Sequence, residues 1–205
     1  MKSYTTILHK GNGKYEEKKS VFIAEAIPIQ TEEEALNFIA TVKKAYSDAR
    51  HHVYAYVLNE NSIARFSDDR EPQGTAGMPV LNVIKKSGCT NTAIVVVRYF
   101  GGTLLGAGGL VRAYTAAASD AIRDAEIITY DIFDSYEIFI SYPDYQKINN
   151  LCSEFDLRIT DTVFADNVKI SFNIRKTDTE RFLKALKELT CARAETHFLG
   201  EKFDF

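Results

Sequence analysis

Residues 93–114 read AIVVVRYFGGTLLGAGGLVRAY, an apolar run that breaks into glycines and then becomes periodic again. Residues 93–99 are almost all apolar, which is typical of a strand buried at the centre of a sheet. Residues 108–125 have the apolar spacing that favours a helix. Between these segments, five of the eleven glycines of the chain fall within nine positions. We therefore predict a strand, a glycine-rich turn and a helix. The glycines indicate that the backbone of the turn adopts positive φ angles or is approached closely by another molecule.

The glycine-rich turn is a candidate anion site, because a helix that follows such a turn offers free N–H groups and the positive end of its dipole. Arg98 and Arg112 flank the turn, and we expect them to contact phosphate. The turn is not a dinucleotide loop, since Val111 occupies the last glycine position of G-x-G-x-x-G. A turn that serves only packing, with both arginines paired to acids, is the alternative. The candidate residues are Arg98, Gly101, Gly102, Gly106, Gly108, Gly109 and Arg112.

A second polar segment, residues 68–77, reads DDREPQGTAG and precedes a predicted helix over residues 78–86. Thr75 is placed to cap that helix. Three carboxylates within four positions are candidates to hold Mg²⁺ through oxygen ligands or to act as an acid–base pair. A solvated loop that pairs with Arg70, a protein-contact surface and a brace for the glycine turn are the alternatives. The residues of this acidic loop are Asp68, Asp69, Glu71 and Thr75.

Further basic residues precede a predicted strand over residues 52–58 and end the helix of residues 78–86. Alternation along the strand puts His51 and His52 on opposite faces, so the two imidazoles are not placed to bind one metal ion. The two lysines at the end of the helix extend a basic surface toward Arg98 and are favoured there by the helix dipole. The additional candidates for phosphate or RNA contact are Arg50, His51, Lys85 and Lys86.

Size and charge narrow the class of protein. A chain of 205 residues with 45% hydrophobic content suits two domains, and a formal net charge of −3 provides no general attraction to nucleic acid or membranes. Any RNA contact therefore depends on a local basic patch. The apolar runs are far shorter than the roughly 20 residues that cross a bilayer. Because the N-terminus also has no secretory signal, we expect a cytoplasmic location.

The elements around the motifs predict an α+β chain in two parts. In the first part, Thr31 and Glu34 form the capping box of a helix, and residues 59–61 turn between two paired strands. From Ser135 the pattern restarts, which puts the domain boundary near Asp134. The predicted strands of the first part are residues 20–29, 52–58, 63–66, 93–99 and a closing strand near 127–133.

The second part follows the order βαββαβ, which is that of a ferredoxin-like domain. Asp166 and Asn167 suit a hairpin turn between its two middle strands. Its strands are predicted at residues 136–141, 158–164, 167–175 and 194–199, and its helices at residues 144–155 and 179–189.

The segments DDREPQGTAGMPVL and VVVRYFGGTLLGAGGLVRAY resemble the two signature segments of the YigZ/IMPACT family, in the same order. The resemblance implies that residues 1–134 form an IMPACT-type domain with a fold like domain 2 of ribosomal protein S5. It also implies that residues 135–205 form a ferredoxin-like domain similar to the last domain of elongation factor G. The order of elements predicted from the residues is compatible with both expectations.

The family resemblance also implies a function in translation. Our leading hypothesis is a non-enzymatic cytoplasmic protein that binds RNA, the ribosome or a translation-associated protein through its first domain. One alternative is a nucleotide-dependent or metal-assisted enzyme, including the proline dipeptidase label given to bacterial relatives. Another is a protein-interaction module whose partner covers the glycine turn. The sequence assigns no catalytic residue, metal ion or cofactor, and it leaves the oligomeric state open.

Overall fold

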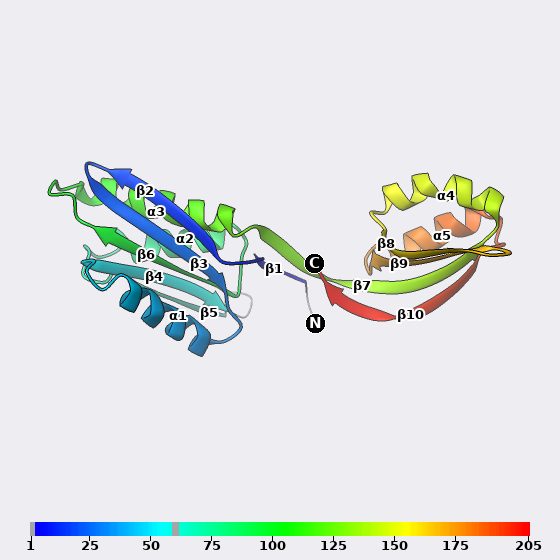
Figure 1. Ribbon diagram of the computed structural model, residues 1–205, viewed down its shortest axis with the longest axis horizontal. Coiled ribbons are helices and arrows are strands. Elements are labelled where there is room, and N and C mark those ends of the chain that lie inside the picture. Colours follow the sequence, from blue (N-terminus) through cyan, green and yellow to red (C-terminus); the bar gives the residue numbers. More distant parts are fainter. Residues whose placement is uncertain (1–2, 59–61) are drawn as a thin grey trace. The chain divides into compact units, whose positions relative to one another are not determined.

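The computed structural model describes residues 3–58 and 62–205, so the predicted turn at residues 59–61 lies outside the described residues. The chain divides into two compact units, one formed by Tyr4–Thr129 and the other mainly by Tyr130–Phe205. Each unit contains both helices and strands (Figure 1), which confirms the predicted α+β class in two parts. Among the residues described, no helix combines the length and the apolar character needed to cross a membrane.

The first unit is built on a five-stranded sheet in the order β2-β3-β6-β4-β5, in which all neighbours are antiparallel. β6 is the central strand and is buried from Thr92 to Arg98, as its apolar run predicts. The strands are β2 (Gly11–Glu17), β3 (Ser20–Pro28), β4 (His51–Leu58), β5 (Ile63–Ser67) and β6 (Thr92–Tyr99).

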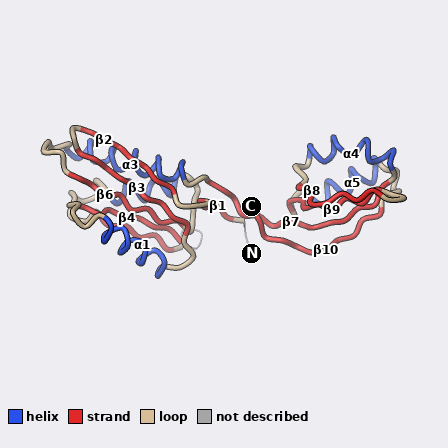
Figure 2. The backbone as a smooth tube through the Cα atoms, in the orientation of Figure 1, coloured by secondary structure: helices blue, strands red, loops and turns tan. Residues whose placement is uncertain are grey.

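Helices cover both faces of this sheet. α2 (Gly77–Lys86) and α3 (Gly106–Asp124) pack on one face, and α1 (Glu32–Ala45) packs on the other. Figure 2 shows α3 and α1 on opposite sides of the sheet. Alternate residues of β6 serve the two cores, since Val96 belongs to the cluster under α2 and α3 and Val95 to the cluster under α1. The sheet is therefore the middle of three layers, which explains why β6 is apolar on both sides.

The start of α1 follows the sequence closely. Thr31 Oγ1 accepts a hydrogen bond from the backbone N–H of Glu34 at 3.2 Å, which confirms the predicted cap. The Glu34 carboxylate accepts a bond from the backbone N–H of Gln30 at 2.6 Å. In a standard capping box the Glu34 carboxylate would accept from the N–H of Thr31, whereas here it accepts from the N–H one residue earlier. The N–H groups of Gln30 and Glu34 therefore both have a partner.

The second unit has the sheet order β8-β9-β7-β10, with antiparallel neighbours. Ile138, Phe172 and Phe182 belong to the core beneath its two helices. The observed βαββαβ order confirms the predicted ferredoxin-like arrangement. The elements are β7 (Ile127–Ile140), α4 (Tyr142–Glu154), β8 (Arg158–Phe164), β9 (Val168–Arg175), α5 (Thr179–Leu189) and β10 (Glu195–Asp204).

The prediction that residues 127–133 form a separate closing strand of the first domain is wrong. β7 continues without interruption to Ile140, and Phe133 already pairs with Arg175 of β9. Residues 127–140 contain no glycine or proline that would end a strand, and pairing with the distant strands β9 and β10 continues β7 to Ile140. The boundary predicted near Asp134 falls inside β7.

The remaining strand, β1 (Tyr4–Ile7), lies at the beginning of the first unit. Thr5 Oγ1 is 2.9 Å from Thr129 Oγ1, at the start of β7. The backbone N–H of Thr90 donates to the carbonyl of Thr5 at 2.8 Å. β1 therefore links the first residues of the unit to its last ones.

Candidate functional site

The acidic loop and the glycine turn meet at one pocket of the first unit. The pocket has a volume of about 310 Å³. Its walls come from the acidic loop, the start of β4, the end of β6 and the start of α3. The two segments that the sequence singles out therefore form a single candidate site. The lining residues are Arg50, His51, Arg70, Glu71, Pro72, Arg98, Phe100, Leu104, Leu105, Gly106, Ala107 and Leu110.

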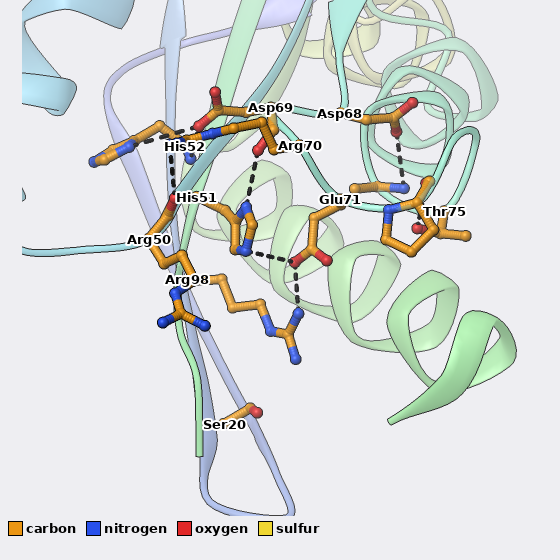
Figure 3. Close-up of polar contacts among 12 residues, drawn as sticks. Ser20, Arg50, His51, His52, Asp68, Asp69, Arg70, Glu71, Thr75 and Arg98 are labelled. Carbon is orange, nitrogen blue, oxygen red and sulfur yellow. Dashed lines mark hydrogen bonds and ion pairs between the residues drawn. The ribbon is translucent and has the colours of Figure 1, made fainter. Parts of the chain in front are cut away.

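Glu71 is the buried acid of this pocket. Its Oε1 accepts from Arg98 Nη1 at 2.6 Å and from the Tyr114 hydroxyl at 2.8 Å, and His51 Nε2 lies 4.0 Å away. Figure 3 shows the Glu71 carboxylate between His51 and Arg98. Burial, the larger cause, and the charge of Glu71, the second, raise the pKa of Tyr114 far above its ordinary value. The Tyr114 hydroxyl therefore remains protonated and donates to the carboxylate.

Arg98 is 5% exposed and forms part of the pocket wall. Its guanidinium carbon lies 5.4 Å from the ring centre of Phe22 and 5.6 Å from that of Phe100. Among the described residues, Arg98 Nε is buried and has no hydrogen-bond partner. Because an unpaired donor of a charged group is costly inside a protein, this nitrogen indicates a place for water or a ligand.

His51 and His52 lie on opposite sides of β4, as predicted. His51 Nδ1 is 2.8 Å from the carbonyl oxygen of Asp69, and since a carbonyl only accepts, Nδ1 carries the proton. His51 Nε2 is consequently the nitrogen on the Glu71 side (Figure 3). His52 Nε2 contacts the carbonyl oxygen of Tyr46 at 2.9 Å, and His52, unlike His51, does not line the pocket.

Asp68, rather than Thr75, satisfies the start of α2. Asp68 Oδ1 accepts from the backbone N–H groups of Ala76 at 3.1 Å and Gly77 at 2.7 Å. The Thr75 hydroxyl donates instead to the carbonyl of Pro72 at 2.7 Å, and the N-cap position falls on Ala76. The prediction that Thr75 caps this helix is therefore wrong, because a carboxylate from the far end of the loop reaches the same donors.

The backbone of the acidic loop turns sharply at Asp69 and Arg70, whose φ angles are +40° and +70°. Such values are uncommon for residues other than glycine. Asp69 Oδ2 accepts from the backbone N–H of His52 at 2.6 Å, and Arg70 Nη2 donates to the carbonyl of Arg50 at 3.2 Å. These bonds hold the turn against β4 and place both arginines at the pocket.

The three carboxylates of the acidic loop have separate partners. Asp68 binds backbone of its own loop, Asp69 binds β4, and Glu71 binds β6 and α3. Within residues 3–58 and 62–205, no group of three or more His, Cys, Asp or Glu side chains is arranged to hold a metal ion.

The glycines of the turn have different structural roles. α3 begins at Gly106, two residues earlier than predicted, so Gly106 lies in its first turn together with Gly108 and Gly109. Gly101 is required by packing, because a Cβ there would meet the backbone of Lys19 at 2.1 Å. At Gly108 a Cβ would meet only Arg112 Nη1, at 3.8 Å. The fold therefore does not explain the glycine at position 108.

The N-terminus of α3 is uncapped. Leu105 occupies the N-cap position and forms no side-chain capping bond, and within the described ranges no side chain is seen to bond to the first N–H groups of the helix. Gly106, with φ of +71°, and Ala107 line the pocket. Gly102, with φ of +85°, shapes the turn before them. The positive end of a helix thus lies at the pocket wall.

The predicted binding residues separate into two groups. Those in the pocket lining are Arg50, His51, Arg98 and Gly106. Arg112 lies outside the lining and pairs with Glu17, with 3.5 Å between Nη2 and Oε1. The other predicted residues outside the lining are Gly101, Gly102, Gly108, Gly109, Lys85 and Lys86.

Arg70 and Phe100 line the pocket but are absent from the set predicted to bind, as are the other lining residues Pro72, Leu104, Leu105, Ala107 and Leu110. Phe100 is 42% exposed, although it follows a strand that is otherwise buried. Its position directly before the glycine pair is the only sequence signal for it. The sequence indicates Arg70 only as a partner for the loop acids, whereas its side chain bonds to a backbone carbonyl.

The fold and the pocket define an α+β protein with a basic pocket in a three-layered first unit and a ferredoxin-like second unit. Residues 18–122 match the Impact N-terminal domain, and residues 138–193 match a domain of unknown function (DUF1949). The chain belongs to the IMPACT family, which confirms the resemblance of its two signature segments.

Several relatives are similar over most of their length. The IMPACT family member YvyE of Bacillus subtilis (strain 168) is 34% identical over 194 residues, which cover 94% of this chain and 89% of the relative. The IMPACT family member YigZ of Escherichia coli (strain K12) is 37% identical over 145 residues, covering 69% and 71%. A crystal structure of a hypothetical protein has a TM-score of 0.61 and 30% identity, with 98% of each chain covered.

Proposed function

We propose that this protein is a cytoplasmic, translation-associated factor that binds RNA, free or within the ribosome, through the pocket of its first unit. The observation that carries the proposal is the charge of the pocket, where Arg50, Arg70 and Arg98 accompany a single carboxylate, that of Glu71. A local excess of positive charge attracts an anionic ligand even though the whole chain has a net charge of −3. Arginine is well suited to phosphate because its guanidinium presents several donors in one plane.

Apolar side chains beside these arginines favour RNA over a simple anion. Phe100 and Leu104 are 42% and 82% exposed. Exposed aromatic residues stack on unpaired bases, and each such contact contributes roughly 1–3 kcal/mol to binding. Phosphate contacts next to a stacking surface are typical of proteins that bind single-stranded RNA.

In this proposal the predicted basic residues contribute unequally to RNA binding. Arg50 and Arg98 contact phosphate directly, because both line the pocket. Arg112, Lys85 and Lys86 lie outside the lining and contribute only long-range attraction.

Binding of a fluorescently labelled single-stranded RNA, followed by anisotropy at several salt concentrations, tests the proposal. Arg50→Gln should weaken binding about tenfold and reduce the salt slope by about 1, because one phosphate contact is lost. Arg123→Gln is the matched control, since Arg123 is also exposed but bonds to Asp120 away from the pocket. An equal effect of the two substitutions would contradict a site at the pocket.

Co-sedimentation with ribosomes, with and without ribonuclease, separates RNA from protein partners. The proposal expects association that falls with salt and is lost after nuclease treatment. Association that survives both treatments would instead indicate a protein partner.

A further inference from the structure

Building on the proposed RNA binding, we propose that the unit recognised in the pocket is a nucleoside 5′-phosphate, either a free mononucleotide or the phosphorylated 5′ end of an RNA. The phosphate contacts Arg50, Arg98 and the uncapped start of α3. The nucleoside lies against Phe100 and Leu104. Four observations carry this inference: which of the predicted basic residues line the pocket, the charge of the pocket, the unpaired nitrogen of Arg98 and the apolar wall.

Of the basic residues predicted to bind, only Arg50, His51 and Arg98 line the pocket. Arg112 pairs with Glu17 outside the lining, and Lys85 and Lys86 at the end of α2 do not reach it either. A protein that follows a single strand over several nucleotides needs a continuous basic groove. A pocket of about 310 Å³ is instead within the range of small-ligand sites and has room for about one nucleotide.

The charge of the pocket matches a terminal phosphate better than an internal one. Three guanidinium groups and one carboxylate line it, which leaves two positive charges unbalanced. A phosphomonoester carries about −1.5 to −2 at pH 7, whereas each internal phosphodiester carries a single negative charge. A 5′-phosphate therefore neutralises the site more completely than a phosphate within the chain.

Two independent features point to the place of the phosphate. Gly106 and Ala107 line the pocket at the uncapped N-terminus of α3, where backbone N–H groups and the helix dipole favour an anion. Arg98 lies in the same wall and is only 5% exposed. Its Nε has no hydrogen-bond partner in the described part of the chain. Glu71 occupies only Nη1 of that guanidinium in the bonds observed.

The apolar wall fits the uncharged part of a nucleotide. Phe100 and Leu104 are both exposed, and Leu105 and Leu110 continue the same wall. The Phe100 ring also lies 5.9 Å from the guanidinium carbon of Arg50, so the stacking surface and a phosphate-binding group are adjacent. A ligand with a flat base and a nearby phosphate contacts both at once.

The test compares two RNA oligonucleotides of one sequence, labelled at the 3′ end, that differ only in a 5′-phosphate or a 5′-hydroxyl. We expect the full-length protein to bind the phosphorylated RNA about tenfold more tightly, as an additional charge-assisted contact would produce. Equal affinity for the two RNAs would overturn this inference while leaving RNA binding intact. Absence of binding to either RNA would overturn the proposed function as well.

Competition identifies the source of the ligand, and substitutions locate it. Displacement by adenosine 5′-monophosphate supports a free nucleotide, and displacement by 5′-phosphorylated RNA alone supports an RNA end. Arg50→Gln should abolish the preference for the 5′-phosphate, whereas Arg123→Gln should preserve it. A preference that persists in Arg50→Gln, with the fold intact by circular dichroism, would contradict binding at this pocket.

Discussion

Arg98 and Glu71 form a buried ion pair, in which Arg98 Nη1 donates to Glu71 Oε1 at 2.6 Å and the two side chains are only 6% and 4% exposed. Arg98 is the second-last residue of β6, before the glycine turn, and Glu71 lies in the acidic loop. The pair therefore joins the two signature segments and forms part of the pocket wall.

Removing one partner of this pair should destabilise the protein strongly. We expect Arg98→Ala to lower the free energy of unfolding by about 3 kcal/mol, because it leaves the Glu71 carboxylate buried without its cation. The double variant Arg98→Ala, Glu71→Gln should lose less than the sum of the single variants. Urea unfolding followed by circular dichroism measures all three, and strictly additive losses would contradict the coupling.

The ion pair of Arg112 and Glu17, in which only Arg112 is largely exposed, provides the control. Its atoms are 3.5 Å apart and Arg112 is 68% exposed, so Arg112→Ala should change the unfolding free energy by less than about 1 kcal/mol. RNA binding should therefore be tested with a substitution of Arg50. In Arg98→Ala a loss of binding could not be separated from the loss of stability.

Tyr114→Phe should reveal the hydrogen bond that Tyr114 donates to Glu71 at 2.8 Å. We expect a loss of about 2 kcal/mol at neutral pH, because the acceptor is charged and buried. The pKa of Tyr114 is raised in the folded protein, so its stabilisation is complete below the unfolded pKa of about 10 and declines as the pH rises above that value. The stabilities of the two proteins should therefore converge in alkali, and parallel curves of stability against pH would refute this assignment.

Asp68→Ala should loosen the start of α2. We expect a loss of about 1–2 kcal/mol, the usual effect of removing a capping side chain. Hydrogen exchange at the amides of Ala76 and Gly77 should accelerate, because both donate to Asp68. Thr75→Ala should leave the exchange of these two amides unchanged. Faster exchange in that variant would show that Thr75 caps α2 and would contradict the assignment to Asp68.

Gly108→Ala should stabilise the protein by about 0.5–1 kcal/mol, since alanine is favoured over glycine within a helix and a Cβ meets nothing closer than 3.8 Å. Gly101→Ala should have the opposite effect, because its Cβ would collide with the backbone of Lys19. Thermal unfolding of the two variants gives the comparison. A lower melting temperature for Gly108→Ala would show that position 108 has a packing requirement absent from the structure.

Local patterns predicted most of the elements. The structure places β8 at Arg158–Phe164 and α5 at Thr179–Leu189, the same residues as predicted, because hydrophobic periodicity and end signals act over a few neighbouring positions. The same local reasoning divided β7 wrongly near Asp134. Whether a strand serves one unit or continues into the next depends on its pairing partners, and these are distant in sequence.

The candidate site was predicted in its parts but not in its arrangement. Of the residues predicted to bind, Arg50, His51 and Arg98 line one pocket, whereas Arg112 lies elsewhere. The prediction does not include Phe100, which also lines the pocket. Adjacent positions on a strand or helix point in different directions, so proximity in sequence does not decide which side chains share a cavity.

The amino-acid sequence was sufficient to determine the family, the α+β class, the buried central strand and the presence of two unusual segments, because each depends on residue types at short spacing. Tertiary structure alone decided that Glu71 pairs with Arg98, that Asp68 caps α2 and that the acidic loop and the glycine turn enclose one pocket. The physical reason is that buried charges and backbone donors must find partners, and in a folded chain the nearest partner is set by packing and not by sequence distance.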